Sequence, residues 1–343
     1  SASGFVECFG KDETRNAQFA ALNPTIQGPQ KRTFKYDKLL PNVGAIYDIT
    51  DEVSAFASYS KGLSVPGTDN LYNSFFFAPD TEQARPDPEK TDSFDLGGRY
   101  RSGKIQAQLS GWFTKYTNRI ASAYDPELDR NVFRNLGRVD KYGIDGSIAY
   151  EPIRELTLYA FGSRNRSKIK DNIQLAGGTG FDCDTSTAPE ATLLRNCAFT
   201  KGNYESGAPK YTYGFSALGR LPFVDLGITA KRTGPRYVYD TNVPTFRGDV
   251  DPGAPGGVQE IFGATAPAYW LVHLDSRFKL DRLGIRGTYL QVNVYNLFDK
   301  FYVGGFGGGL SQSVNTTTGV YGNPGFVQIG APRTISATLN LGL

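Results

Sequence analysis

Apolar and polar side chains alternate one by one along most of this chain. In residues 335–343, apolar side chains occupy every odd position, and small or polar ones occupy every even position. Residues 94–101, 105–114, 224–231 and 269–280 repeat the pattern. Successive side chains of a β-strand point to opposite faces of the sheet, so this period predicts strands with one apolar and one polar face.

Turn signals divide these segments into about eleven strands, which predicts an all-β chain folded as an antiparallel up-and-down sheet. Several strands exceed the roughly ten residues that cross a bilayer, so we expect them to extend beyond the membrane surface. The predicted strands cover residues 34–49, 53–65, 91–100, 105–124, 131–150, 156–169, 210–221, 223–239, 268–280, 285–303 and 326–343.

Short and long connections alternate between the predicted strands. In an up-and-down sheet alternate connections lie at the same end, so the pattern predicts tight turns at one end and loops at the other. Outer-membrane barrels show this asymmetry. Tyr47, Tyr100 and Tyr150 lie near short turns, at positions that belong to the apolar face of their strands, as in the aromatic girdle of a membrane barrel. The long connections are residues 66–89, 125–130, 170–208, 240–267 and 305–325.

The composition is compatible with a transmembrane barrel. A barrel needs lipid-compatible side chains only at alternate positions, so its average hydropathy resembles that of a soluble chain. The net charge of +3, without a basic run, argues against a nucleic-acid partner. No composition shift marks a second compact domain. We therefore expect residues 33–343 to form one part of a β-barrel, and residues 1–32 to form an extracellular loop segment.

The cysteines indicate an oxidising compartment. Cys183 and Cys197 lie close together in a long polar segment, which favours a loop disulfide over two free thiols. Cys8 is left over, either as a buried thiol or as one half of a bond to a segment outside this chain. The chain contains no Met and no signal-peptide pattern, so we expect a processed or partial chain.

Several segments, in the same order and spacing, resemble the C-terminal half of TonB-dependent outer-membrane receptors. The barrels of that family have about 22 strands, so this chain would supply roughly half of one. The plug domain and the TonB box of the family lie in the N-terminal half and are absent from this sequence. The resemblance rests on residues 40–44 with 57–62, 88–97, 135–139 with 143–146, 293–302 and 330–334.

The resemblance implies TonB-dependent active import of a scarce nutrient across the outer membrane of a Gram-negative bacterium. The cargo implied is a siderophore-type iron chelate or a similar large ligand. The partners implied are the plug domain, the remaining barrel strands, the TonB-ExbB-ExbD complex acting through the plug, and outer-membrane lipid. Carbohydrate uptake by the same family, a passive porin-like barrel and a secreted all-β binding module remain alternatives.

Catalytic and metal-binding residues are scarce. His273 is the single histidine and lies in the middle of a predicted strand, so we expect a lumen-facing polar residue and no enzyme. We predict no cofactor and no metal site, because one histidine and scattered cysteines do not make a closed site. Aromatic residues in two long loops are candidates for ligand contact, with packing inside the loops as the alternative. They are Tyr72, Phe75, Phe76 and Phe77 in one loop, and Tyr237, Tyr239 and Phe246 in another.

Cationic residues at the predicted lumen positions make the inner wall positive in places. Such a wall favours an anionic ligand through the field in a narrow cavity, and ion pairs with plug carboxylates are an equally good interpretation. The cations assigned to the lumen are Arg99, Lys115, Arg119, Arg138, Arg164, Arg166, Lys231, Arg232 and Arg277.

Overall fold

The regular elements of this chain are β-strands. The computed structural model describes residues 33–67, 87–125, 130–174, 183–187, 197–248, 258–280, 284, 286–306, 314–315, 320–321 and 327–342. The predicted loop segment 1–32 lies outside these residues, so the domain division stays a prediction. Among the described residues, no helix is long and apolar enough to cross a membrane.

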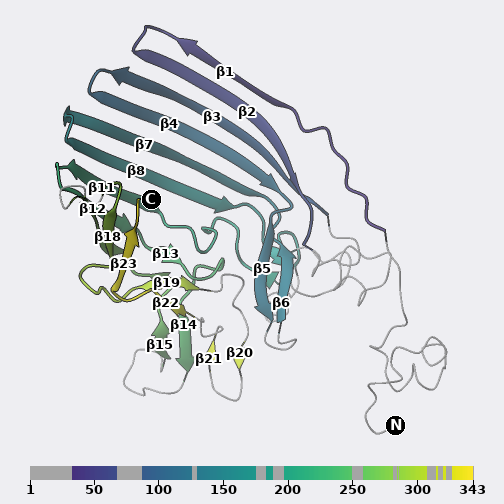
Figure 1. The fold of residues 1–343 in the computed structure, drawn as a ribbon. Coiled ribbons are helices and arrows are strands. Elements are labelled where there is room, and N and C mark those ends of the chain that lie inside the picture. Colours follow the sequence, from purple (N-terminus) through teal and green to yellow (C-terminus); the bar gives the residue numbers. More distant parts are fainter. Residues whose placement is uncertain are drawn as a thin grey trace.

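One antiparallel sheet of 11 strands dominates the structure, and its strands follow one another in chain order (Figure 1). The predicted up-and-down sheet of about eleven strands is therefore confirmed. The sheet curves from β1 at one edge to β23 at the other. Its strands are β1 (Asn42–Asp48), β2 (Val53–Ser64), β3 (Glu89–Ser102), β4 (Ile105–Thr117), β7 (Val139–Ile153), β8 (Leu156–Ile169), β11 (Tyr211–Arg220), β12 (Val224–Thr233), β17 (Tyr269–Lys279), β18 (Tyr289–Tyr295) and β23 (Thr334–Asn340).

The remaining short strands lie in the long connections. They form small sheets of their own: β5 with β6, β9 with β10, β13 with β16, β19 with β22, and the four strands β15, β14, β21 and β20. They are β5 (Ile120–Asp125), β6 (Arg130–Asn135), β9 (Ile173–Gln174), β10 (Cys197–Ala198), β13 (Arg236–Tyr237), β14 (Thr245–Gly248), β15 (Val258–Phe262), β16 (Thr265–Ala266), β19 (Val303–Phe306), β20 (Val314–Asn315), β21 (Val320–Tyr321) and β22 (Val327–Ile329).

Residues in the left-handed conformation interrupt strands that the alternation predicts as continuous. Asn118, with φ 56°, separates β4 from β5, and Gly137, with φ 68°, lies between β6 and β7. Asn296, with φ 51°, follows the last residue of β18. A positive φ departs from the extended backbone of a regular strand, and Asn and Gly adopt it at the lowest cost. The alternation was right about the faces but wrong about the lengths of these strands.

The strand register gives the sheet one continuous apolar face. Direct pairing carries this face without a break from β4 to the edge strand β23. We call it the outer face, and the opposite one the inner face. One row of it, in strand order, is Ile105, Tyr150, Leu158, Ala217, Ile228, Leu274, Val294 and Ile335.

The outer face is the convex one. On β7, Tyr142, Ile144 and Ile148 are exposed, whereas Asp145 and Ser147 between them are partly covered. A curved sheet shields its concave side, so the polar residues line the hollow and the apolar residues stand outside. This is the arrangement of a membrane barrel, with lipid outside and a polar lumen within.

Aromatic side chains border the apolar band at both ends of the strands. Tyr100 and Tyr150 stand on the outer face beside the short turns, as predicted, and Tyr142 stands on the same face at the other end of β7. From Tyr142 to Tyr150 the strand rises by about 26 Å, or roughly 20 Å along the membrane normal for a tilt near 40°. The band is therefore close to the apolar height of roughly 25 Å in membrane barrels.

On the inner face, aromatic rings cover glycines of the neighbouring strand. Trp112 stands directly opposite Gly143, and a Cβ on Gly143 would lie 2.7 Å from the indole ring. Phe161 has the same relation to Gly214. The missing side chains let large rings lie flat against the wall, which keeps the hollow of the sheet open.

Candidate functional site

The long connections leave the sheet at one end, which we call the loop end; the opposite end is the turn end. They follow β2, β4, β8, β12 and β18. The short connections, such as the one between β3 and β4, lie at the turn end. The predicted asymmetry is thus present in the structure. It places the polar, chemically rich segments of the chain together at the loop end.

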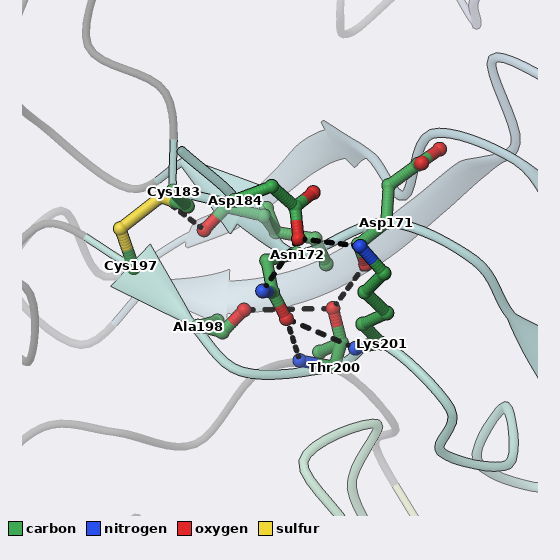
Figure 2. Close-up of a disulfide and its surroundings, with 9 residues drawn as sticks. Asp171, Asn172, Cys183, Asp184, Cys197, Ala198, Thr200 and Lys201 are labelled. Carbon is green, nitrogen blue, oxygen red and sulfur yellow. Dashed lines mark hydrogen bonds and ion pairs between the residues drawn. A yellow bond between two sulfur atoms is a disulfide. The ribbon is translucent and has the colours of Figure 1, made fainter. Parts of the chain in front are cut away.

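A disulfide closes the base of the connection between β8 and β11 (Figure 2). Cys183 and Cys197 are joined by an S–S bond of 2.04 Å, with their Cα atoms 5.7 Å apart. Cys197 also belongs to β10, which pairs with β9 at Ile173 and Gln174. The predicted loop disulfide is therefore present and is reinforced by a two-stranded ladder.

Asn172 ties the two sides of this clamp together (Figure 2). Its Oδ1 accepts the backbone N–H groups of Thr200 and Lys201, each at 3.1 Å. Its Nδ2 donates to Asp184 Oδ1 at 3.0 Å, and the same oxygen accepts from Lys201 Nζ at 2.9 Å. The segment after the disulfide is consequently anchored to the end of β8.

Arg119, in the connection after β4, is linked at the loop end to the start of β3 and to the connection before β11. Its Nη1 donates to Glu89 Oε2 at 2.8 Å, and its Nε and Nη2 donate to Glu205 Oε1 at 3.0 and 2.9 Å. Lys141 Nζ lies 2.6 Å from the other oxygen of Glu205, and both cations stand over the ring of Tyr116. Burial lowers the pKa of Arg119, but the two carboxylates outweigh it and raise the pKa above its ordinary value.

A second group of contacts joins the segment after the disulfide to the segment after β13; we call it the clasp. The Asn203 side chain donates to the carbonyls of Asp240 and Thr241, at 3.1 and 2.9 Å. Asn242 Oδ1 accepts from Tyr204 N at 2.8 Å, and Asn242 Nδ2 donates back to the Tyr204 carbonyl at 2.8 Å. The clasp joins residues 203–206 to residues 240–242.

Asp240 is the titratable residue of the clasp whose pKa is shifted furthest. It is 1% exposed, and its Oδ1 accepts from Ser206 N at 2.7 Å. Burial raises the pKa of Asp240 to about 6; the contact with Ser206 opposes the shift, Glu205 adds to it, and Arg119 opposes it. The loop end therefore contains a carboxyl group that changes charge near neutral pH.

An aromatic and cationic cluster lies beside the clasp. Tyr237 stacks on Tyr204 with ring centroids 5.4 Å apart. Lys210 Nζ lies 4.4 Å from the Tyr237 centroid and 5.2 Å from the Tyr204 centroid. Tyr237 was a predicted ligand-contact residue, whereas Tyr204 and Lys210 were missed because no alternation marks residues 203–210.

The other predicted contact residues have different surroundings. Tyr239 is 6% exposed and packs with Val238, Ala266 and Phe262, and burial raises its pKa to about 12. Phe246 is half-buried in β14, opposite Glu260 of β15. Tyr72, Phe75, Phe76 and Phe77 lie outside the described residues.

His273 stands on the inner face of β17, opposite Thr229. Its Nδ1 accepts the backbone N–H of Asn296 at 3.2 Å, and its ring meets the edge of Tyr295. These contacts of His273 lie where β18 ends. The described residues bring no group of metal-ligating side chains together.

The lumen assignment of several cations was wrong. Arg99, Lys231 and Arg277 stand on the inner face as predicted, while Arg119 and Arg138 lie in a loop. The register places Lys115, Arg164, Arg166 and Arg232 on the outer face instead. These cations stand at the loop end, where the apolar alternation has stopped and parity alone no longer shows which face is apolar.

Comparisons with known proteins agree with this architecture. The family model of the TonB dependent receptor-like beta-barrel matches residues 11–297. The ferric aerobactin receptor of Klebsiella pneumoniae is 21% identical over 127 residues, which are 34% of this chain and 17% of that receptor. The siderophore receptor PiuA of Acinetobacter baumannii aligns with a TM-score of 0.55 at 17% identity, over 88% of this chain and 35% of that one. The copper transporter OprC aligns with a TM-score of 0.55 at 14% identity, over 88% and 39%.

The solved structures share the fold of this chain at low sequence identity. The chain spans between a third and two fifths of their length, and a smaller part of the aerobactin receptor. The family match, in contrast, covers well over half of this chain, and its members are receptors and not enzymes. The two-faced sheet, the loop end and this match lead to one conclusion: the chain belongs to the TonB-dependent receptor β-barrel family.

Proposed function

We propose that this chain forms a loop-bearing wall of a TonB-dependent importer in the outer membrane of a Gram-negative bacterium. The observation that carries the proposal is the unbroken apolar row from Ile105 to Ile335 on the convex face, combined with long connections at one end only. A water-soluble sheet would have to cover such a face, whereas lipid solvates it.

The wall needs further barrel strands and a plug. β1 and β23 are the edges of the described sheet, and an open edge in lipid leaves backbone groups without hydrogen bonds. The remaining strands of the family's barrel would pair with these edges. The inner-face cations Arg99, Lys231 and Arg277 would then face the plug, through which the TonB-ExbB-ExbD complex delivers energy.

The cargo that we propose is a siderophore-type iron chelate. Relatives are named as a ferric aerobactin receptor and a siderophore receptor. In this chain, the cluster of Tyr204, Tyr237 and Lys210 combines flat rings with a cation, which suits an anionic chelate. Recognition of the chelator by rings and a cation needs no side chain that ligates the iron itself.

Uptake of labelled iron tests the proposal directly. The complete receptor, produced in iron-starved cells that lack other siderophore receptors, should import ⁵⁵Fe from at least one chelate of a hydroxamate, citrate-type and catecholate panel. Import should disappear in a strain without TonB. Uptake of labelled maltodextrin in place of iron would point to carbohydrate import, and entry that persists without TonB would point to a passive barrel.

A further inference from the structure

A line of cations stands on the outer face at the loop end of β8. Arg164, Arg166 and Lys168 are exposed, whereas Ser167 between them is buried and points to the inner face. Alternate residues of a strand lie about 6.6 Å apart, so the three charges cover a stretch of about 13 Å. The wall of the proposed barrel therefore turns a strip of positive charge away from its lumen.

Within the described part of the chain, no carboxylate compensates the charge of this strip. Arg164, Arg166 and Lys168 form no ion pair with any residue that the structure describes. The directly paired carboxylate, Asp140 opposite Lys168, is held by Lys170 Nζ at 2.9 Å. Arg166 stands over the ring of Tyr204, 5.7 Å from its centroid, which leaves the guanidinium N–H groups for another acceptor.

Aromatic residues place the strip at the border of the apolar band. Tyr142 stands directly opposite Arg166, and Tyr211 stands directly opposite Arg164, both on the outer face. Tyrosine rings of this kind mark the level where hydrocarbon meets polar headgroups. Long basic side chains at that level reach toward the headgroups while their stems stay against apolar surface.

A groove on the outer face leads away from these cations. It has a volume of about 1100 Å³ and crosses the sheet from Arg164 and Arg166 on β8 to Val43 on β1. Phe113 and Tyr142 form one wall, and Leu96 and Ile144 form the other. Gly111 keeps the second wall low on β4.

The groove runs obliquely into the apolar band. At the turn end the aromatic border moves along the strands, from Tyr47 on β1 to Tyr100 on β3 and Tyr150 on β7, each one row nearer the turn end. A groove that follows one row therefore starts at headgroup level on β8 and lies deeper in the band on β1. The groove has cations at one end and apolar walls along its length, which matches the phosphate and the acyl chains of a phosphorylated lipid.

We propose that Arg164, Arg166 and Lys168 bind the phosphate of an anionic lipid headgroup, with its acyl chains in the adjoining groove; this rests on the proposed membrane placement. Arginine presents a planar fork that binds phosphate oxygens in pairs, and lysine adds a point charge. The three cations lie on the convex face, outside the lumen, and Arg166 also stands over the ring of Tyr204 at the edge of the proposed ligand cluster.

Lipid binding to the complete receptor tests the site. We would titrate the detergent-purified protein with diphosphorylated lipid A, with dephosphorylated lipid A and with inorganic phosphate, and follow bound lipid by native mass spectrometry. The R164Q/R166Q/K168Q variant should bind lipid A at least about tenfold more weakly. The matched variant R101Q/R154Q/R220Q removes equal charge at the turn end and should bind lipid A like the wild type. The wild type should bind dephosphorylated lipid A as weakly as the R164Q/R166Q/K168Q variant binds lipid A.

A second variant tests the groove with the charges intact. Gly111→Leu places an apolar side chain in the groove and should weaken lipid A binding while the barrel still shows heat-modifiable migration. Equal lipid A binding by the wild type and either the triple variant or Gly111→Leu would overturn the proposal, as would displacement of lipid A by equimolar inorganic phosphate. The assay involves no transport, so a wild type that binds lipid but imports nothing would refute the importer proposal alone.

Discussion

Arg119 and Glu205 lie 86 residues apart in the sequence, and two guanidinium N–H groups of Arg119 donate to the same oxygen of Glu205, at 3.0 and 2.9 Å. Glu89 accepts from the same guanidinium group. The contact fastens the segment after β4 to the segment before β11, so the loops that would meet a ligand share one support.

Arg119→Ala should loosen this support. The change leaves Glu89 and Glu205 partly buried without their shared partner, which costs about 3 kcal/mol of local stability. Hydrogen exchange of residues 203–207 in the complete receptor measures the loss. Arg138→Ala is the control, because the Arg138 side chain, which forms an ion pair with Asp171, is 58% exposed, and an exposed ion pair contributes little to stability. Equal protection in the two variants would contradict the assignment.

Removing the disulfide should act locally. The bond closes a loop with a sequence separation of 14, so the C183S/C197S variant should lose about 3 kcal/mol of stability in this loop. Limited proteolysis should then cut between β9 and β10 faster than in the wild type. Heat-modifiable migration of the barrel should not change, because both cysteines lie in the connection between β8 and β11 and neither belongs to a strand of the main sheet. A barrel that fails to assemble would show that the disulfide does more than clamp the loop.

The clasp should weaken as pH rises. The pKa of Asp240 is raised from 3.8 to about 6 in the folded protein, so between these values the folded state holds a proton that the unfolded state has lost. Its contribution to stability therefore falls across this window and is constant above it. Exchange of the Ser206 amide, corrected for its intrinsic rate, should show more protection at about pH 4 than at about pH 7. Asp240→Asn should abolish the difference, and a difference that survives in this variant would assign it to another group.

The two faces of β7 should differ in their tolerance of charge. Ile148→Lys puts a cation on the outer face, between the middle of the apolar band and its turn-end border, and should cost about 1–3 kcal/mol in lipid. Ser147→Lys adds the same charge to the inner face and should cost little. Urea unfolding in lipid vesicles compares the two variants. Equal costs would mean that the convex face is not the lipid face.

Tyr237 and Tyr239 are neighbours with separate predicted roles. Tyr237→Ala removes half of the stacked pair beside Lys210 and should lower ligand affinity without loss of fold. Tyr239→Ala empties a buried site and should destabilise this part of the loop end by about 3–5 kcal/mol. Titration with the imported chelate and thermal unfolding separate the two effects. Intact affinity in Tyr237→Ala would favour loop packing as the role of both residues.

The alternation of apolar and polar residues predicted the strands well, because neighbouring residues of a strand determine which side chains belong to each face. The order of the main sheet, the loop asymmetry and the cystine all follow from such short-range signals. Asn118 breaks one predicted strand with a conformation that asparagine tolerates, so a weak local signal was available there.

The contacts of the loop end carried no such signal. The residues around Arg119 in the sequence do not indicate that its partner is Glu205. The two residues are far apart in the sequence and meet only because the fold brings their connections together. The positions of Arg164 and Arg166 were missed for a related reason. Parity assigns a residue to a face only when the neighbouring strand positions still alternate, and on β8 they stop doing so at the border of the apolar band.

The unbroken pairing of the outer face restricts how this protein can change length. Adding one residue within β7 would turn every later outer side chain of that strand inward, until a bulge or a second insertion restored the parity. Adding residues between β8 and β11 disturbs no row of the sheet. Length variation among descendants of this sequence should therefore collect at the loop end, where new binding surfaces can arise while the wall that carries them keeps its register.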